Sequence, residues 1–242
     1  MSIIRATVLV IYFIIVYNIE VQPTTDRTVH HSFNAHLLRP LEYKLSIFGQ
    51  INLGISENLE VGTQGFAWLL SSPNFSIKHR LFQYDAHQLA VSINCLFAEK
   101  SLFEYIHLDV AKGVVIPLSI IDTVQWKSNF FVNIGIYDFL SFFTFEGVET
   151  SSEVHLISPS IGFDWIVSSH IDINLNAYYP SYFLSYYQDS TGSVQKNKVY
   201  LDRGVLFSSI TYHYGKAYFE LGYIFMSRFL GSVPFVNIYW RV

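Results

Sequence analysis

The sequence predicts one antiparallel β-barrel that spans a membrane, with about twelve strands, or about ten if two weak segments merge. Three observations lead to this prediction. Apolar and polar residues alternate with a period of two after about residue 30, the chain is poor in charge and rich in aromatic residues, and no apolar run beyond the amino terminus reaches helical spanning length. Because unpaired backbone groups are not tolerated in lipid, strands that enter a membrane must close into a barrel.

The composition supports a surface that faces lipid. Only 14% of the 242 residues are charged, against about a quarter in an average soluble domain, while 51% are hydrophobic and 17% aromatic. The net charge of −4 gives no basic field, so we expect no nucleic-acid partner. With Cys95 as the single cysteine, the chain has no internal disulfide and no Cys/His zinc framework, and no nucleotide-binding motif is present. We therefore expect no cofactor and no metal.

The amino terminus has the pattern of a signal peptide. A positive charge at Arg5 precedes the apolar run 6–17, which is too short for a spanning helix. We predict a signal peptide over residues 1–22, with a cleavage site that the sequence places only between about residues 18 and 28. The alternative is an uncleaved anchor. Residues 30–242 are predicted to form the barrel.

The clearest strand is the segment Ile171–Tyr179. Its apolar residues point one way and Asp172, Asn174 and Asn176 the other, which gives one lipid face and one wet face. The same alternation recurs in six further stretches of the chain: 45–55, 89–97, 132–137, 160–167, 219–225 and 236–242. We predict that the apolar faces point outward.

About eleven strands follow from this pattern, the first near Lys44 and the last ending at Val242. An even barrel needs one more strand, and the segment His31–Leu38 is expected to supply it. Pro117 and Pro159 each remove a ladder hydrogen bond within a strand-like run. The expected tight turns, which would lie at one end of the barrel, are the five polar segments 56–58, 84–87, 122–123, 168–170 and 213–216.

The closing stretch Phe235–Val242 resembles the terminal strand of bacterial outer-membrane β-barrel proteins. In those proteins the last residue is usually Phe or Trp, whereas here Trp240 stands two places before the last residue, Val242. The hairpin Asn52–Thr63 is similar to the first periplasmic turn of many uncharacterised barrels of this class. The resemblance implies a location in the outer membrane of a Gram-negative bacterium, contact with its lipid, and recognition of Phe235–Val242 by the barrel assembly machinery. We also expect a monomer.

The candidate functional residues are polar side chains that the alternation directs into the lumen. Ten residues make up this set: Glu60, Gln64, Lys78, Arg80, Asp164, Asp172, Asn174, Asn176, Glu220 and Arg241. Such residues either line a narrow aqueous path or form a plug of salt bridges and hydrogen bonds, since small barrels often fill their interior. The leading expectation is a structural barrel or a passive channel for small solutes without enzymatic activity.

Two other functions stay open. An outer-membrane hydrolase of the lipase or protease type would use histidines near hydroxyl or carboxyl groups: the set Ser209, Thr211 and His213, the pair Asp138 and His155, or the pair His107 and Asp109. A soluble, lipocalin-like binder of apolar ligands would require the apolar strand faces to point inward. The aromatic stretch 178–187 fits a girdle at the membrane boundary or, alternatively, a surface that stacks on sugars.

Overall fold

The computed structural model describes twelve parts of the chain: residues 21–23, 29–31, 34–46, 50–64, 67–68, 72–99, 110–145, 151–179, 182–188, 194–200, 204–226 and 232–241. Most of the predicted signal peptide and the pair His107 and Asp109 lie outside these residues. No helix in the described parts is long and apolar enough to cross a membrane.

Sixteen strands follow one another along the described residues. Two short ones, β1 (Val21–Pro23) and β2 (Val29–His31), pair with each other apart from the main sheet. The main sheet contains β3 (Tyr43–Ser46), β4 (Gln50–Ser56), β5 (Leu59–Gln64), β6 (Asn74–Tyr84), β7 (His87–Glu99), β8 (Val110–Lys127), β9 (Phe130–Phe145), β10 (Ser151–Ile166), β11 (Ile171–Tyr178), β12 (Tyr182–Gln188), β13 (Val194–Tyr200), β14 (Val205–Tyr214), β15 (Ala217–Met226) and β16 (Ser232–Arg241).

The main sheet closes into an antiparallel barrel. Strands β3 to β11 and β14 to β16, twelve in all, pair in sequence, and β16 pairs with β3 to complete the ring. The predicted all-β up-and-down barrel of twelve strands is therefore confirmed. Closure leaves no edge strand within this described ring of twelve, which is the condition for a sheet to stand in lipid.

The position of the twelfth strand was predicted wrongly. Of the range His31–Leu38, the described residues do not join the barrel: His31 belongs to β2, and residues 34–38 lie in the lumen. The extra strand comes from the run 45–55, which was expected to be one strand but forms the antiparallel pair β3 and β4. The register pairs Tyr43 with Leu53, so odd-numbered residues lie on the same face of both strands, and Leu45 and Leu53 both remain on the exposed face.

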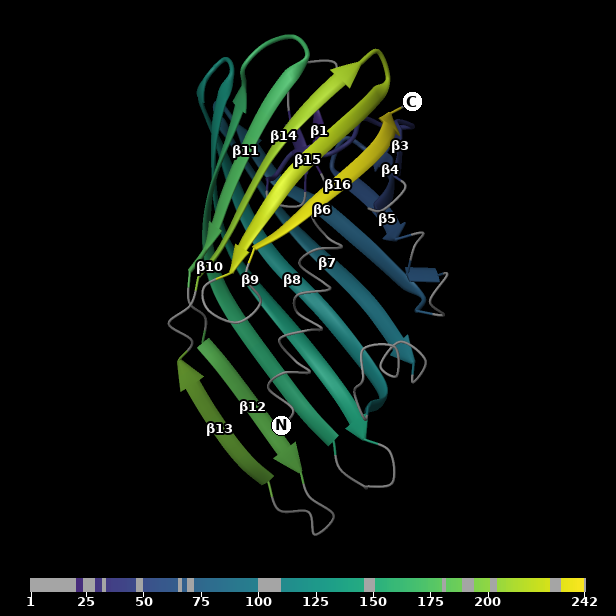
Figure 1. Cartoon of the computed structure of the whole chain (residues 1–242), viewed down its shortest axis with the longest axis vertical. Helices are drawn as coiled ribbons and strands as arrows, with labels where there is room; N and C mark the ends of the chain where they lie inside the picture. The colour runs from purple at the N-terminus through teal and green to yellow at the C-terminus, as the bar shows by residue number, and fades with distance from the viewer. Residues whose placement is uncertain are drawn as a thin grey trace.

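Strands β8, β9 and β10 extend far beyond the short strands of the opposite wall, because they contain 18, 16 and 16 residues against 7 for β4 and 6 for β5. In Figure 1 this tall wall continues downward, where the hairpin of β12 and β13 lies beside β10. Residues 151–157 of β10 pair with β12, and residues 160–166 pair with β11. Pro159, which has no backbone N–H to donate, stands at this changeover.

The end of the barrel opposite the β12–β13 hairpin carries the short connections. Two-residue turns join β4 to β5, β6 to β7, β8 to β9 and β14 to β15. Asp85 and Gly215 adopt positive φ angles of 51° and 60°, as tight hairpin turns require. The turn expected at Asp122 and Thr123 was misplaced: β8 continues to Lys127 and turns at residues 128–129.

The outer face of the barrel is apolar. Leu175 and Leu221 are exposed, the latter to 62%, whereas Asp172 and Asn174 are buried on the opposite face of β11. Apolar residues therefore point outward, as predicted, and the orientation that a lipocalin-like soluble barrel would need is not present in the described strands.

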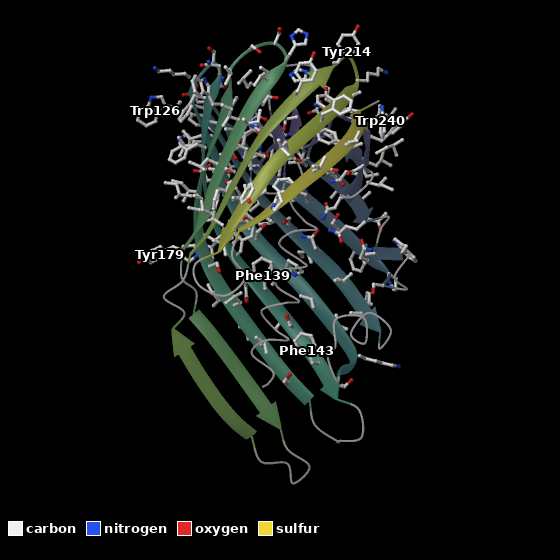
Figure 2. The ribbon with its side chains drawn as sticks, in the orientation of Figure 1. Trp126, Phe139, Phe143, Tyr179, Tyr214 and Trp240 are labelled. Carbon is white, nitrogen blue, oxygen red and sulfur yellow. The ribbon has the colours of Figure 1, made fainter. Side chains whose placement is uncertain are left out.

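Exposed aromatic residues mark the limits of the apolar band. Figure 2 shows Trp126, Tyr214 and Trp240 near the end with the short turns and Tyr179 about halfway down the molecule. Aromatic residues at two levels are typical of the two lipid–water boundaries. Below Tyr179, the outer face of β9 and β10 carries the charged residues Asp138, Glu153 and His155, so this part of the wall lies outside the membrane-spanning segment. The architecture is that of a membrane-spanning, up-and-down antiparallel β-barrel.

Candidate functional site

The structure places nine of the ten candidate residues on the buried face of the barrel wall. They belong to strands on both sides of the lumen: Glu60, Gln64, Lys78, Asp164, Asp172, Asn174, Asn176, Glu220 and Arg241 are all buried. Arg80 is only partly buried and lies next to a β-bulge, between Arg80 and Phe82, near the turn into β7. Its guanidinium Nη1 donates to Gln83 Oε1 at 2.5 Å.

Residues 34–38, which we call the luminal segment, lie between these walls. All five are buried, and Ala35 has no exposed surface at all. The segment is neither helix nor strand, so its backbone groups need other partners. The barrel wall supplies them. Ala35 N–H donates to Thr123 Oγ1 at 2.7 Å, and Leu38 N–H donates to Glu60 Oε2 at 2.9 Å.

Lys78 completes this set of contacts, since its Nζ donates to the His36 carbonyl oxygen at 2.7 Å. Two side chains of the luminal segment also bind the wall. Asn34 Nδ2 donates to Asp164 Oδ2 at 3.3 Å, and His36 Nδ1 lies 2.9 Å from Gln88 Oε1. The contacts come from five strands, β5 to β8 and β10, so the segment is held across a wide arc of the wall.

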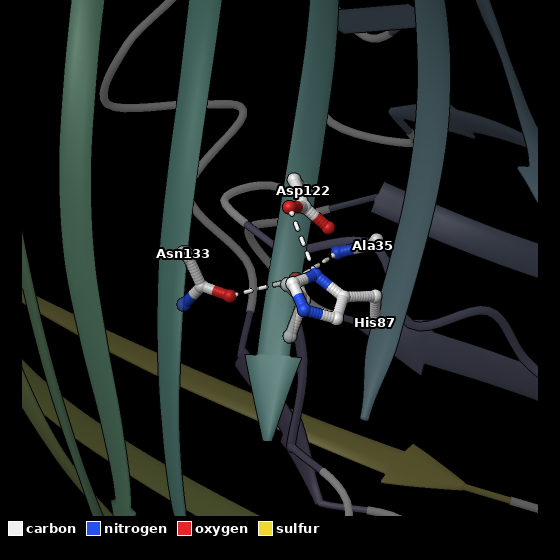
Figure 3. Close-up of polar contacts among 5 residues, drawn as sticks. Ala35, His87, Asp122 and Asn133 are labelled. Atoms are coloured by element: carbon white, nitrogen blue, oxygen red, sulfur yellow. Dashed lines mark hydrogen bonds and ion pairs between the residues drawn. The ribbon is translucent and has the colours of Figure 1, made fainter. Parts of the chain in front are cut away.

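The wall residues that hold the segment are themselves held by neighbours. The Thr123 hydroxyl accepts from the Ala35 N–H and donates to Asn133 Oδ1 at 2.7 Å, so it joins these two residues, which are labelled in Figure 3. Asn133 Nδ2 in turn donates to Asp164 Oδ2 at 2.7 Å. Asn52 Nδ2 donates to Glu60 Oε1 at 2.5 Å on the other side of the segment. These bonds hold the acceptors of the luminal segment in place.

Gly54 on β4 receives the end of the segment at very close range. A Cβ atom at this position would lie 2.0 Å from the Arg39 carbonyl oxygen and 2.9 Å from that of Leu38. Two backbone bonds secure the turn that follows, Leu41 N–H to Gly54 O at 2.8 Å and Gly54 N–H to Glu42 O at 2.9 Å. Only glycine leaves room for the main chain here.

Opposite charges also meet near the start of β3. Arg241 Nε lies 2.5 Å from Glu42 Oε1, and Lys44 Nζ stands 4.8 Å from the centre of the Tyr239 ring. Lys44 is also close enough to Glu220 to interact with its charge. This part of the lumen is a compact set of paired charges, one of the two arrangements that the sequence left open.

The inner wall is not polar over its whole length. Toward the tall wall the inward residues become apolar and aromatic, with Val115, Phe139, Phe143, Phe207 and Ile224 all buried. Figure 2 shows Phe139 and Phe143 in this lower part of the molecule. The simple expectation of apolar residues outside and polar residues inside therefore holds for the part of the barrel near the short turns and fails beyond it.

Asp138 and His155, one candidate pair for a hydrolase, do lie together. His155 Nδ1 is 3.1 Å from Asp138 Oδ2, and Nε2 is 3.0 Å from Glu153 Oε1. Burial lowers the pKa of His155, but the hydrogen bonds and charges of the two carboxylates outweigh it, and the net pKa is raised above the ordinary value. Both ring nitrogens are occupied by carboxylates, so neither is placed to activate a nucleophile.

The other described candidates lie on the inner face of β14. His213 Nε2 is 3.8 Å from Asp172 Oδ2. Ser209 lies beside Glu220, and Thr211 Oγ1 has no hydrogen-bond partner within the described part of the chain. No hydroxyl in this set is paired with an imidazole. Among the described residues no group of three or more His, Cys, Asp or Glu side chains is placed to hold a metal ion.

Comparisons with known proteins give similarities only to solved structures. No family model and no curated protein matches the chain. The CymD monoaromatic hydrocarbon channel is similar with a TM-score of 0.39 and 9% identity, over 83% of this chain and 86% of that one. OmpT of Vibrio cholerae, expressed in the outer membrane, has a TM-score of 0.43 and 9% identity, over 94% and 73%. The same protein folded in vitro has a TM-score of 0.37 and 8% identity, over 91% and 66%. At these values no activity is transferred to this chain.

Proposed function

We propose that this protein is a passive channel for small polar solutes in the outer membrane of a Gram-negative bacterium, and that the luminal segment closes it in the state described. The observation that carries the proposal is the position of residues 34–38, which are buried inside the ring and bonded to five of its strands. Wall residues beside the segment, among them Thr123 and Asp164, are buried as well. A continuous water path past them requires the segment to move.

The residues around the segment support a path for polar solutes once it is displaced. The wall there presents hydroxyl, amide and charged groups, and acidic residues such as Glu60 and Asp164 are offset by basic ones such as Lys44 and Lys78. A polar lumen with nearly balanced charge selects neither cations nor anions, so it favours small polar solutes. The proposal assigns no catalytic step and needs no cofactor.

The second candidate function is a purely structural barrel. The network of hydrogen-bonded side chains in the wall beside the segment favours it, because such networks also stabilise filled barrels. The two functions differ in what happens when the segment is released. A channel opens, whereas a structural barrel loses stability without conducting.

Single-channel recording in planar bilayers separates these outcomes. The double variant Ala35→Pro, Leu38→Pro removes the two N–H donors that bind Thr123 and Glu60 and leaves the wall unchanged. We expect long closed periods for the native protein and discrete open steps for the variant. The matched control Ala35→Gly, Leu38→Met keeps both donors and should stay closed. A folded double-proline variant that never conducts would overturn the proposal.

Three further expectations belong to the proposal. The apolar face contacts outer-membrane lipid, Phe235–Val242 is the signal for the barrel assembly machinery, and the protein is a monomer. Support comes from β16, which holds most of that stretch and closes the ring against β3 and β15 of the same chain. Replacing Trp240 by Ala should reduce the amount of folded barrel in the membrane while the purified protein still refolds in detergent.

A further inference from the structure

The luminal segment is held mainly through its backbone. Three of its contacts use main-chain atoms: the N–H of Ala35, the carbonyl of His36 and the N–H of Leu38. A fourth close contact, at Gly54, is with the carbonyl oxygen of Arg39. Every peptide carries these groups, whatever its side chains. The wall therefore recognises a feature that the segment shares with any short peptide.

The groups that make these contacts form a built site. Glu60 is 2% exposed, Thr123 1% and Lys78 8%. Asn133 and Asn52 hold the acceptor groups of Thr123 and Glu60 in place. Along the segment, the Thr123 hydroxyl accepts from one N–H, the Lys78 ammonium donates to the next C=O, and the Glu60 carboxylate accepts from a second N–H. These three buried groups therefore match the order N–H, C=O and N–H along a peptide. When the segment leaves, these groups lose the hydrogen bonds that they make to its main chain, so an incoming molecule gains by replacing those bonds.

The remaining contacts allow for different side chains. His36 lies edge-on to Phe131 with 5.2 Å between ring centres, and Ala35 and Leu37 pack with Ala90. These are small or apolar contacts that other residues of similar size can make. A sugar has hydroxyl groups that both donate and accept, but it has no main chain with N–H and C=O groups at the spacing of residues 35–38.

We infer that the seat formed by Gly54, Glu60, Lys78 and Thr123 is a binding site for short peptides, and that peptides are the solute class of the channel. This inference rests on the proposed function. A peptide that enters the barrel competes with the luminal segment for the same backbone contacts, so binding of the solute and opening of the path are one event.

Block of an opened channel tests this inference. The full-length Ala35→Pro, Leu38→Pro variant leaves the seat free and provides the open current. The probe is the blocked hexapeptide with the sequence of residues 34–39, Asn-Ala-His-Leu-Leu-Arg. Its control is the same peptide methylated on the backbone nitrogens of the alanine and the second leucine. Loss of two hydrogen bonds predicts that the methylated peptide blocks about tenfold less well or worse. A trisaccharide of similar mass should not block.

A change in the wall gives the complementary readout. Thr123→Val removes the hydroxyl oxygen that accepts the Ala35 N–H, and in the same open background it should weaken block by the unmodified peptide but not by the methylated one. Equal block by the two peptides, or block by the trisaccharide as strong as by the peptide, would overturn the inference.

Failure of the inference is distinguishable from failure of the proposed function. A folded double-proline variant without current refutes the channel itself. A variant that conducts, yet treats both peptides alike, refutes only the peptide site. If the double variant does not fold, Ala35→Glu provides the open state, because a carboxylate at this fully buried position next to Ala90 expels the segment.

Discussion

Substitution of Gly54 by alanine is the most specific way to test how the luminal segment is seated. The new methyl group would lie 2.0 Å from the Arg39 carbonyl oxygen, whereas ordinary contact begins near 3.4 Å. Either the segment or β4 must therefore shift by more than an ångström. A shift of this size breaks the backbone bonds that join Gly54 to Leu41 and Glu42, which are 2.8 and 2.9 Å long.

The expected effect follows from these losses. Overpacking costs about 1–3 kcal/mol and each of the two lost hydrogen bonds about 0.5–1.5 kcal/mol, so the seated state is destabilised by roughly 2–6 kcal/mol relative to the released state. Since about 1.4 kcal/mol corresponds to a factor of ten, the ratio of open to closed time should rise about 30-fold at the lower limit and about 20,000-fold at the upper limit.

Single-channel recording measures this ratio directly. Gly135→Ala is the matched control, because it also adds a methyl group to the inner wall but meets the flexible Ser160 hydroxyl at 2.9 Å instead of the luminal segment. The control should stay as closed as the native protein. If Gly54→Ala folds, as shown by its shift on gels after boiling, and remains as closed as Gly135→Ala, the close approach of the segment to β4 does not hold the channel shut.

Three further predictions concern the barrel itself. The pKa of His155 is raised in the folded protein, so its ion pairs stabilise the fold at pH values below the ordinary histidine pKa. This contribution disappears as the pH rises through the folded pKa. The difference in unfolding temperature between the native protein and His155→Gln should therefore be larger at pH 6 than at pH 9. Gly222→Ala places a methyl group 2.1 Å from the Phe235 ring and should lower the stability by about 1–3 kcal/mol. Urea titration of the detergent-solubilised protein measures this loss, and an unchanged midpoint would contradict the packing. Leu221→Arg puts a charge on the most lipid-exposed part of β15 and should cost about 2–4 kcal/mol of stability in lipid, whereas a neutral effect would place this face outside the bilayer.

Alternation alone was sufficient to predict the wall of the barrel. In Ile171–Tyr179 every second residue is apolar, and a strand with this pattern has just one way to face lipid. The buried side chains of Asp172, Asn174 and Asn176 follow from the same parity. The number of strands was predicted correctly for a partly wrong reason, since the closure argument demanded an even number but did not say which segment supplied the last strand.

The luminal segment could not be predicted in the same way. Its contacts join residues far apart in sequence, such as Ala35 with Thr123 and Asn34 with Asp164, and none of them produces a periodic pattern. The break between β3 and β4 was missed because the apolar parity continues across it. One local signal existed: Gly54 faces inward within a strand, where glycine often marks the close approach of another backbone.

Thiol accessibility of the luminal segment tests the central claim most directly. In a Cys95→Ser background, which removes the single native cysteine, Ala35→Cys introduces one thiol at a position with no exposed surface. Reaction with a water-soluble maleimide should be slow in the folded protein in lipid vesicles and fast after boiling. Rapid labelling of the folded, closed protein at position 35 would show that the segment does not occupy the lumen, and the proposed closure would be wrong.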